Sequence, residues 1–136
     1  MYGNCLGRMK KELLKPTKIY SNEILKISDA RLIHASAHIT GGGLIENLLR
    51  SIPNGLSLNI NLSKIKTTDI FKWLKNKNIS DQEMLQTFNC GIGMALIISK
   101  NDLRKTQNFF ANNKEEFFVI GKVIKSTKNE ERCIIT

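Results

Sequence analysis

The chain contains the stretch Ala37-His38-Ile39-Thr40-Gly41-Gly42-Gly43-Leu44-Ile45-Glu46-Asn47, in which three glycines separate a strand-like segment from a helix-like one. Before the glycines, apolar and polar residues alternate, with one row at Ile33, Ala35, Ala37 and Ile39 and the other at His34, Ser36, His38 and Thr40. Alternation of this kind predicts a strand with one apolar face and one polar face. The polar row, with its two histidines, therefore leads directly to the glycines.

Consecutive glycines in front of a helix are typical of sites that hold anions. Glycine has no Cβ, so the backbone N–H groups of Gly41, Gly42 and Gly43 can turn toward one point. The unpaired N–H groups and the dipole of the following helix add positive potential there. The stretch thus predicts a site for phosphate or another oxyanion. A tight strand-to-helix turn also needs glycine for steric reasons alone, and the histidines can equally be hydrogen-bonded strand residues, so both interpretations stay open here.

Length and cysteine content limit the class of protein. Residues 1–136 fit a single domain, which buries roughly two-thirds of its unfolded surface and so has room for a hydrophobic core. The three cysteines are widely spaced and form no C-x-x-C pair, which argues against a disulfide framework and against a zinc site. No segment approaches the ~18 apolar residues of a membrane span, and the first residues lack the apolar core of a signal peptide. We therefore expect a cytoplasmic protein with no membrane partner and no metal site on this chain.

The formal net charge of +9 raises the question of nucleic-acid binding. The excess is mostly lysine spread along the chain, together with abundant asparagine and isoleucine, which are the residues that AT-rich codons favour. No arginine-rich helix, interleaved aromatic set or zinc-finger spacing accompanies it. We therefore do not expect nucleic acid as the main ligand, although the positive field would help to steer a phosphorylated substrate.

Patterns along the chain predict a mixed β-sheet with helices packed against it, in the α/β (α+β) class. Residues 1–15 are basic and are expected to form a loose lead-in. The expected strands cover residues 16–27, 32–39, 56–62, 94–98, 117–124 and 132–135, the last two as a hairpin through residues 126–129. The expected helices follow the glycines over residues 44–52, then cover residues 68–75, 80–88 with a capping box at its start, and 101–112. Trp73 is expected in the core.

A second glycine-containing turn, Phe88-Asn89-Cys90-Gly91-Ile92-Gly93-Met94, joins a short helix to an apolar strand. Asn89 offers an amide that both donates and accepts hydrogen bonds, while Gly91 and Gly93 allow a backbone or a ligand to approach closely. This turn could lie close to the first one. Cys90 has no neighbouring base pattern, and we expect a buried, small apolar residue rather than a nucleophile.

Several motifs in the same order resemble one family. They are Leu13-Leu14-Lys15-Pro16-Thr17-Lys18-Ile19-Tyr20, then His34-Ala35-Ser36-Ala37-His38-Ile39-Thr40-Gly41-Gly42-Gly43 with Glu46-Asn47, then Glu83-Met84 and Thr87-Phe88-Asn89-Cys90-Gly91-Ile92-Gly93-Met94. They look like the C-terminal half of phosphoribosylformylglycinamidine cyclo-ligase, also called aminoimidazole ribonucleotide synthetase, over nearly the whole chain. The resemblance implies an enzyme of purine biosynthesis that uses ATP and Mg²⁺ to close an imidazole ring, with the fold of that family's C-terminal domain.

The resemblance also implies which residues meet the ligands, formylglycinamidine ribonucleotide and ATP. His38, and with it His34, would donate hydrogen bonds or carry protons near the reacting amide. Phosphate and substrate would contact Thr40, Gly41, Gly42, Gly43, Asn47, Asn89, Gly91 and Gly93. Thr17 and Lys18 of the first motif are also expected to bind substrate or phosphate. Lys18 stands where the family has arginine and so keeps the charge without the planar fork.

The family joins this half to an N-terminal half with a glycine-rich loop and acidic residues. That half binds most of the Mg-nucleotide and forms much of the contact in a homo-oligomer. These residues contain no such part, so we expect the chain alone to be catalytically incomplete, whether a separate chain supplies the other half or the gene is truncated. The alternative is a non-catalytic domain that binds another protein through the face which the missing half would cover.

Overall fold

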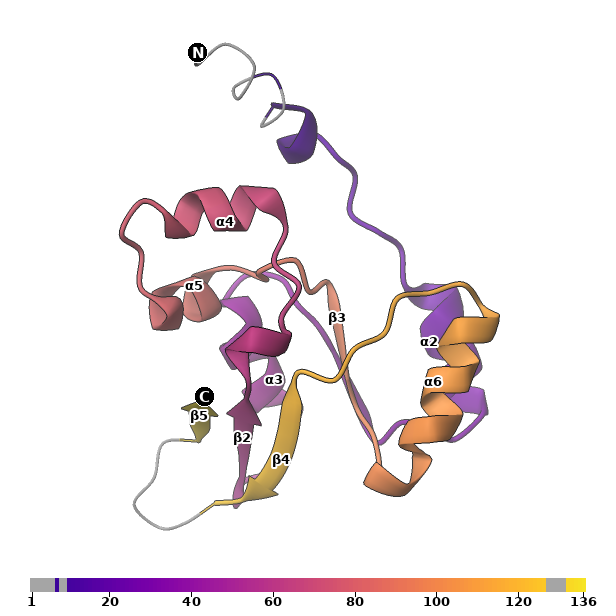
Figure 1. The fold of residues 1–136 in the computed structure, drawn as a ribbon. Coiled ribbons are helices and arrows are strands. Elements are labelled where there is room, and N and C mark those ends of the chain that lie inside the picture. Colours follow the sequence, from indigo (N-terminus) through magenta and orange to yellow (C-terminus); the bar gives the residue numbers. More distant parts are fainter. Residues whose placement is uncertain (1–6, 8–9, 127–131) are drawn as a thin grey trace.

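The fold combines helices with two small β-sheets, which confirms the α/β class (Figure 1). The structure, a computed structural model, describes residue 7 and residues 10–126 and 132–136. The strands are β1 (Ala35–His38), β2 (Leu56–Ile60), β3 (Met94–Ile97), β4 (Gly121–Lys125) and β5 (Cys133–Ile135). The helices are α2 (Ser21–Asp29), α3 (Gly43–Arg50), α4 (Asp69–Lys75), α5 (Asp81–Thr87) and α6 (Leu103–Asn112), with 3-10 turns η1 (Leu62–Lys64) and η2 (Lys100–Asp102).

Both sheets pair strands that are remote in the sequence. In the first, β1 pairs antiparallel with β3, so that His38 is opposite Met94. In the second, β2 lies in the middle, antiparallel to β4 and parallel to β5. The strands therefore form two sheets where the sequence pattern predicts one mixed sheet.

The hydrophobic core lies between the strands and helices α3 and α5. It takes apolar side chains from β1, α3, β2, α5 and β3, with the most deeply buried being Leu44, Ile60, Leu85, Ile39 and Leu58. Helices α2 and α6 lie side by side at the other end of the molecule (Figure 1). No helix among the residues that the structure describes is long and apolar enough to cross a membrane.

The alternation in front of the glycines forms a strand with the expected faces. Ala37 and Ile39 are buried, whereas the side chains of the other row are exposed, namely His34, Ser36, His38 and Thr40. The capping box is also confirmed, because Ser80 Oγ accepts a hydrogen bond from the Glu83 N–H at 3.2 Å. Local patterns of polarity and capping are therefore sufficient to locate these two elements.

The strand predicted over residues 16–27 is wrong, because helix α2 begins within it at Ser21. Residues 16–20 belong to no helix or strand. Ile27 is fully buried and Ile24 is half-buried, whereas Leu25 is 63% exposed. Burial at a spacing of three residues is helical, while a strand would have put Leu25 and Ile27 on the same face.

The hairpin predicted for the last two strands is also wrong. β4 and β5 lie on opposite edges of β2, with β5 parallel to it. The strand predicted from residue 117 starts only at Gly121, where an added Cβ would overlap the Asn59 carbonyl of β2. Of the predicted turn, residues 127–129 lie outside the described residues. Turn-forming residues between two strands do not determine which edge each strand finds, and β2 offers both of its edges.

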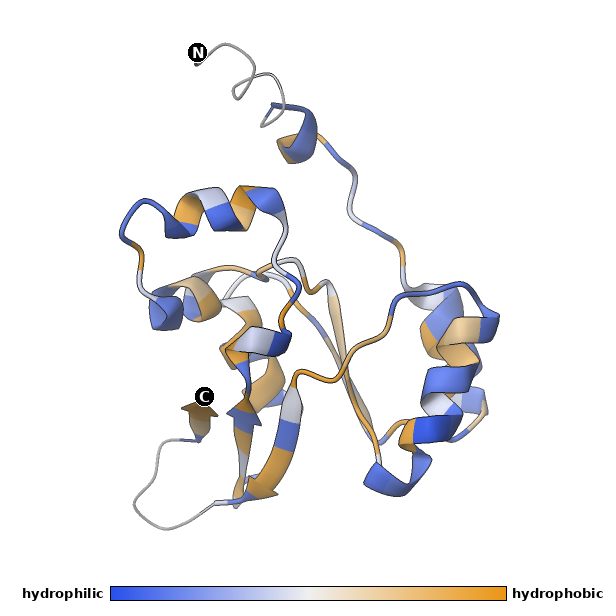
Figure 2. Cartoon of the chain, in the orientation of Figure 1, coloured by the Kyte–Doolittle hydropathy of each residue, from blue (hydrophilic) through white to orange (hydrophobic). Residues whose placement is uncertain are grey.

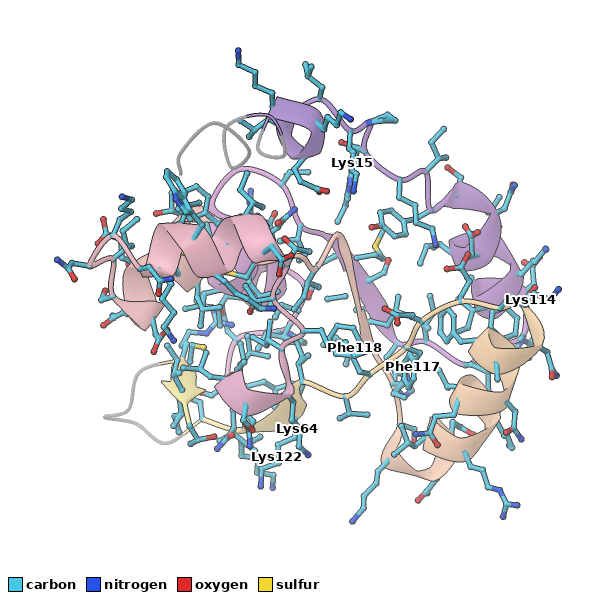
Figure 3. All side chains as sticks on the ribbon, turned by 45° about the horizontal axis from the view of Figure 1, so that its top comes forward. Lys15, Lys64, Lys114, Phe117, Phe118 and Lys122 are labelled. Atoms are coloured by element: carbon cyan, nitrogen blue, oxygen red, sulfur yellow. The ribbon has the colours of Figure 1, made fainter. Side chains whose placement is uncertain are left out.

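The segment between α6 and β4 ties the two ends of the molecule together. Phe117 and Phe118, labelled in Figure 3, are adjacent on this extended segment. The Phe117 ring stacks on Phe110 of α6, with centroids 5.1 Å apart and an interplanar angle of 8°. Phe118 packs against the core. The side chains of two consecutive residues thus anchor the segment on opposite sides.

Trp73 does not lie in the core as expected. It is 36% exposed on α4, and Lys77 Nζ lies 5.2 Å from its ring centroid. The short α4 turns Phe71 and Leu74 toward the core instead. A helix of this length has one buried side, and Trp73 lies at its margin.

The lead-in expected over residues 1–15 is described only in part. Residues 10–13 form a helical turn, in which the Leu14 N–H donates to the Lys10 carbonyl at 3.2 Å. Residues 1–6 and 8–9 lie outside the described residues. Leu14 is 83% exposed, so this turn places an apolar side chain in solvent.

Candidate functional site

The two glycine-containing turns lie against each other. The Ile39 N–H donates a hydrogen bond to the Gly93 carbonyl at 2.9 Å, which extends the pairing of β1 with β3. The Leu44 N–H donates to the Phe88 carbonyl at 3.2 Å and joins the first turn of α3 to the end of α5. We call this junction, residues 40–43 with residues 88–93, the glycine seam. The structure therefore brings together the two segments that the sequence analysis singled out.

Two of the three consecutive glycines have a steric reason to be glycine. Gly42 and Gly43 have left-handed backbones, with φ of 90° and 64°. A Cβ on Gly43 would lie 2.5 Å from the Leu85 carbonyl oxygen, because α3 and α5 touch backbone to backbone at this point. A Cβ on Gly42 would overlap the Glu46 carboxylate. Around Gly41 no atom lies within 4 Å of an added Cβ, so packing does not require glycine there.

Asn47 holds the glycine turn in its shape. Its side chain is buried, and Nδ2 donates hydrogen bonds to the carbonyls of Gly41, at 3.1 Å, and of Gly43, at 2.7 Å. Oδ1 accepts a hydrogen bond from Arg50 Nη2 at 2.9 Å. Both N–H groups of the amide are thereby used. Direct contact of Asn47 with a ligand stays a prediction, and it would require the amide to give up one of these bonds.

Glu46 determines the charge on one side of the turn. Its carboxylate folds over Gly42, and Oε1 lies 3.7 Å from Arg50 Nη2. The helix N–H groups and dipole that would attract a phosphate also stabilise this carboxylate. Beside these side chains the surface opens into a hollow of about 580 Å³. A phosphate on Gly42 would have to displace Glu46, whose side chain is 61% exposed and can turn toward Arg50.

The second half of the seam is a tight turn around Cys90 and Gly91. The Ile92 N–H donates to the Asn89 carbonyl at 2.8 Å, and the two central residues have φ of 51° and 93°. Asn89 Oδ1 accepts a hydrogen bond from the Gly91 N–H at 3.1 Å. Among the described residues, Asn89 Nδ2 has no acceptor, so this side of the amide is available to donate to a ligand.

The two histidines occupy different positions in the polar row. His38 is the last residue of β1 and stands next to the seam, opposite Met94. His34 lies before β1, where its N–H donates to the Ile97 carbonyl at 2.8 Å. They are four positions apart in the sequence, which is about 13 Å along a strand. One reacting group at the seam can therefore contact His38 but not His34 as well, and the role of each stays a prediction.

Lys18 is already paired within the chain. Its ammonium donates to the Glu115 carboxylate, and this hydrogen bond, together with the negative charges of Glu115 and Glu23, raises the pKa of Lys18 above its usual value. Thr17 beside it is exposed, as is Thr40 at the start of the glycine turn. Contact of Lys18 with a phosphate would compete with Glu115.

Cys90 is buried, as the sequence predicts, and we expect it to be unreactive in the native protein. It is 4% exposed, with Sγ 3.5 Å from the Met84 carbonyl oxygen. Burial, and to a smaller extent the negative charge of Asp81, raises the pKa of the thiol to about 11. Because the thiolate is the nucleophile, iodoacetamide at pH 8 should label Cys90 far more slowly in the native state than in urea.

Peptide mapping by mass spectrometry separates this labelling from that of the other cysteines. A Cys90→Ala variant supplies the blank for the peptide concerned. Native labelling of Cys90 at pH 8 as fast as in urea would contradict the burial of the thiol.

Comparison with known proteins supplies the family. A family model described as AIR synthase related protein, C-terminal domain, matches residues 5–134. The chain belongs to this family. The phosphoribosylformylglycinamidine cyclo-ligase of Ligilactobacillus salivarius is 40% identical over 134 residues, which is 98% of this chain and 38% of the relative.

Two further relatives extend the comparison. The cyclo-ligase of Nitrosococcus oceani is 41% identical over 121 residues, 88% of this chain and 34% of the relative. The trifunctional purine biosynthetic protein adenosine-3 of Bos taurus is also 41% identical over 121 residues, but there the match covers 12% of the relative. The AIR synthase C-terminal domain seen here thus spans 12–38% of the length of these three relatives.

The resemblance to cyclo-ligases implies ATP and Mg²⁺, which need different groups from the protein. Magnesium prefers several carboxylate or other oxygen ligands. At the glycine turn Glu46 brings one carboxylate, and it lies beside the Arg50 guanidinium. In the part of the chain that the structure describes, no three His, Cys, Asp or Glu side chains gather as metal ligands. The donor groups at the seam therefore do not fit a Mg²⁺ site.

Sequence reasoning missed two contacts that shape this AIR synthase turn. It did not foresee that Asn47 holds the carbonyl of Gly43, or that Glu46 covers Gly42. In both pairs the side chain comes four residues after the glycine. Residues at this spacing are neighbours on a helix, so the pattern could have indicated both contacts.

Proposed function

We propose that this chain is the substrate-binding C-terminal part of a phosphoribosylformylglycinamidine cyclo-ligase. The reaction is the ATP-dependent closure of formylglycinamidine ribonucleotide to aminoimidazole ribonucleotide, in the purine biosynthesis of the cytoplasm. Identities of about 40% to curated cyclo-ligases support the activity. The glycine seam supports the place at which the chain holds a phosphate.

The open space beside Gly41 is the observation that supports the proposed site. Sterics account for Gly42 and Gly43, but no atom lies within 4 Å of a Cβ added to Gly41. Gly41 precedes the N-terminus of α3, where backbone N–H groups attract anions. The open space over Gly41 is therefore where a phosphate can approach the backbone closely.

The proposed chemistry depends on positioning more than on a protein nucleophile. The amide oxygen of the substrate takes the γ-phosphoryl group of ATP, and ADP leaves. A nitrogen of the same substrate then attacks the activated carbon, the carbon–oxygen bond to phosphate breaks, and the nitrogen loses a proton. On this chain Thr40 and Gly41 hold a phosphate, Asn89 Nδ2 donates a hydrogen bond, and His38 accepts the proton.

Titration of the ¹⁵N-labelled chain tests the proposed site. Formylglycinamidine ribonucleotide, ATP and inorganic phosphate are added separately, and backbone amide signals are followed by NMR. We expect the ribonucleotide to shift the amides of residues 41–43 and 89–93 saturably. The Gly41→Ala variant should bind it roughly tenfold more weakly, a loss of about 1.4 kcal/mol, because the new methyl group fills the open space. If neither turn responds to any of the three ligands, the proposed site is wrong.

A second polypeptide segment is needed for turnover in this proposal, because the seam does not suit Mg²⁺. The chain is mixed with the preceding part of the Ligilactobacillus salivarius enzyme, and formation of aminoimidazole ribonucleotide is measured. We expect no product from either part alone and product from the mixture. Product from this chain alone would overturn the assignment of Mg-nucleotide binding to the other part.

A second candidate function, binding of another protein, is favoured by exposed apolar side chains. Figure 2 shows hydrophobic residues in the segment before α2. The most exposed large apolar side chains are Leu14 at 83%, Ile19 at 79% and Leu13 at 69% in that segment, and Leu25 at 63% on α2. A hollow of about 660 Å³ between β3, α6 and β4 is also lined mainly by apolar side chains. Sedimentation analysis tests for association. A chain that stays monomeric at high concentration, with the ribonucleotide bound, would count against this second function.

A further inference from the structure

Tyr20 brings a third sequence motif to the glycine seam. It is the residue before α2, and its carbonyl accepts a hydrogen bond from the Ile24 N–H at 3.0 Å, which fixes it to the first turn of the helix. From there its ring reaches His38, with the ring centroids 6.0 Å apart and an interplanar angle of 63°. This is the edge-to-face arrangement that aromatic rings prefer.

Gly93 makes room for the Tyr20 side chain. A Cβ on Gly93 would lie 2.8 Å from Tyr20 Cζ and would overlap the hydroxyl oxygen. Gly93 is not among the glycines with positive φ, so its backbone conformation is not the reason for glycine here. Its carbonyl accepts the hydrogen bond from the Ile39 N–H that joins the two turns. The phenol therefore lies directly on the backbone of the seam.

The Tyr20 ring has a further charged neighbour. Lys18 Nζ lies 5.6 Å from the ring centroid, within the range of a cation–π contact. The same ammonium is bound to the Glu115 carboxylate at the start of the connection from α6 to β4. Tyr20 is thus fixed by its helix, by Lys18 and by the Gly93 backbone.

His38 has little else to restrain it. Its side chain is exposed on the polar face of β1, and no hydrogen bond or ion pair to its imidazole occurs within the described part of the chain. The edge-to-face contact with Tyr20 is therefore the interaction that limits rotation of the ring about its side-chain bonds.

We propose that Tyr20 is a positioning residue, which sets the orientation of the His38 imidazole at the glycine seam. The use of that orientation in catalysis rests on the proposed function, but the contact itself does not. Gly93 takes part because any larger residue would expel the phenol from the seam. Lys18 supports the Tyr20 ring rather than contacting a phosphate.

Proton NMR of the imidazole ring tests the proposal, since the chain has only two histidines. Removing the aromatic ring in Tyr20→Leu removes its ring-current field and its restraint, so we expect the His38 ring signals to move. Tyr20→Phe keeps the ring and should leave the His38 signals near their wild-type positions. The His34 signals serve as the internal control in every variant, because His34 lies about 13 Å along the strand from His38.

Gly93→Ala supplies an independent route, because it displaces the phenol without changing Tyr20. It should move the His38 signals in the same way as Tyr20→Leu and leave those of His34 in place. His38 signals that stay at their wild-type positions in Gly93→Ala, or in a folded Tyr20→Leu, would overturn the proposal. Equal movement of both histidines would also overturn it, because the effect would then be a general loss of structure.

The ribonucleotide titration separates this proposal from the proposed function. If wild-type amides at residues 41–43 ignore every ligand while Tyr20→Leu still moves the His38 signals, the function is wrong and the positioning contact stands. If the amides respond but His38 does not depend on Tyr20, the positioning role is wrong and the ligand site stands.

Discussion

Gly43→Ala should lower the free energy of unfolding by about 2–5 kcal/mol, the sum of a left-handed backbone penalty and overpacking. The backbone φ of Gly43 is 64°, and an added Cβ would lie 2.5 Å from both the Leu85 carbonyl oxygen and the Gln86 carbonyl carbon. These neighbours are backbone atoms of α5, so no side chain can rotate away. Relief requires α3 and α5 to separate, which exposes the core around Leu44. Urea denaturation followed by circular dichroism measures the loss.

The matched control is Gly41→Ala, two residues earlier in the same turn. No atom lies within 4 Å of its added Cβ, and Gly41 is not among the glycines with positive φ. Its free energy of unfolding should stay within about 0.5 kcal/mol of the wild type. Equal destabilisation by the two substitutions would show that the turn does not pack on α5 as described.

Asn47→Ala should lower the free energy of unfolding by about 2–4 kcal/mol, because three hydrogen bonds are lost and the buried Gly43 carbonyl loses its side-chain donor. The amide donates to the carbonyls of Gly41 and Gly43, and it accepts from Arg50. The Gly43 bond is buried, so its carbonyl cannot recover the lost partner in water. Asn47→Asp should be at least as harmful, since a carboxylate of the same shape cannot donate to either carbonyl.

Asn108→Ala is the control for the change of residue type alone. Asn108 lies on the exposed side of α6, with no side-chain hydrogen bond to another described residue. Its loss should change the free energy of unfolding by less than about 0.5 kcal/mol. An Asn47→Ala variant as stable as Asn108→Ala would mean that the amide does not hold the glycine turn.

Substitutions at three positions of the turn also separate its shape from phosphate binding. Asn47 and Gly43 are expected to act on stability first, whereas Gly41 should act on phosphate affinity with little change in stability. The alternatives that the sequence leaves open, a tight turn or an anion site, therefore apply to different glycines of the same run. Steric constraints explain glycine at positions 42 and 43, whereas phosphate binding is the proposed explanation for Gly41.

Local chemistry allowed several elements to be foreseen from the sequence. The alternating row from Ile33 to Thr40 became β1 with the expected faces, and Ser80 became the cap of α5. The sequence pattern predicts a strand over residues 16–27, where α2 (Ser21–Asp29) begins, because the apolar residues there partly fit both the helical and the strand period. Only the packing of Ile27 against the rest of the molecule, with Leu25 left in solvent, distinguished helix from strand.

The sequence by itself determined the family, the strand-to-helix turn with its three glycines and the choice of residues that bear chemistry, because these depend on residue type and short spacing. The tertiary structure decided which strands share a sheet, that β5 lies beside β2, and that Tyr20, His38 and Gly93 meet at one place. Such contacts join segments that are remote in the chain. Their free energy comes from burial and backbone pairing between whole elements, which no local pattern specifies.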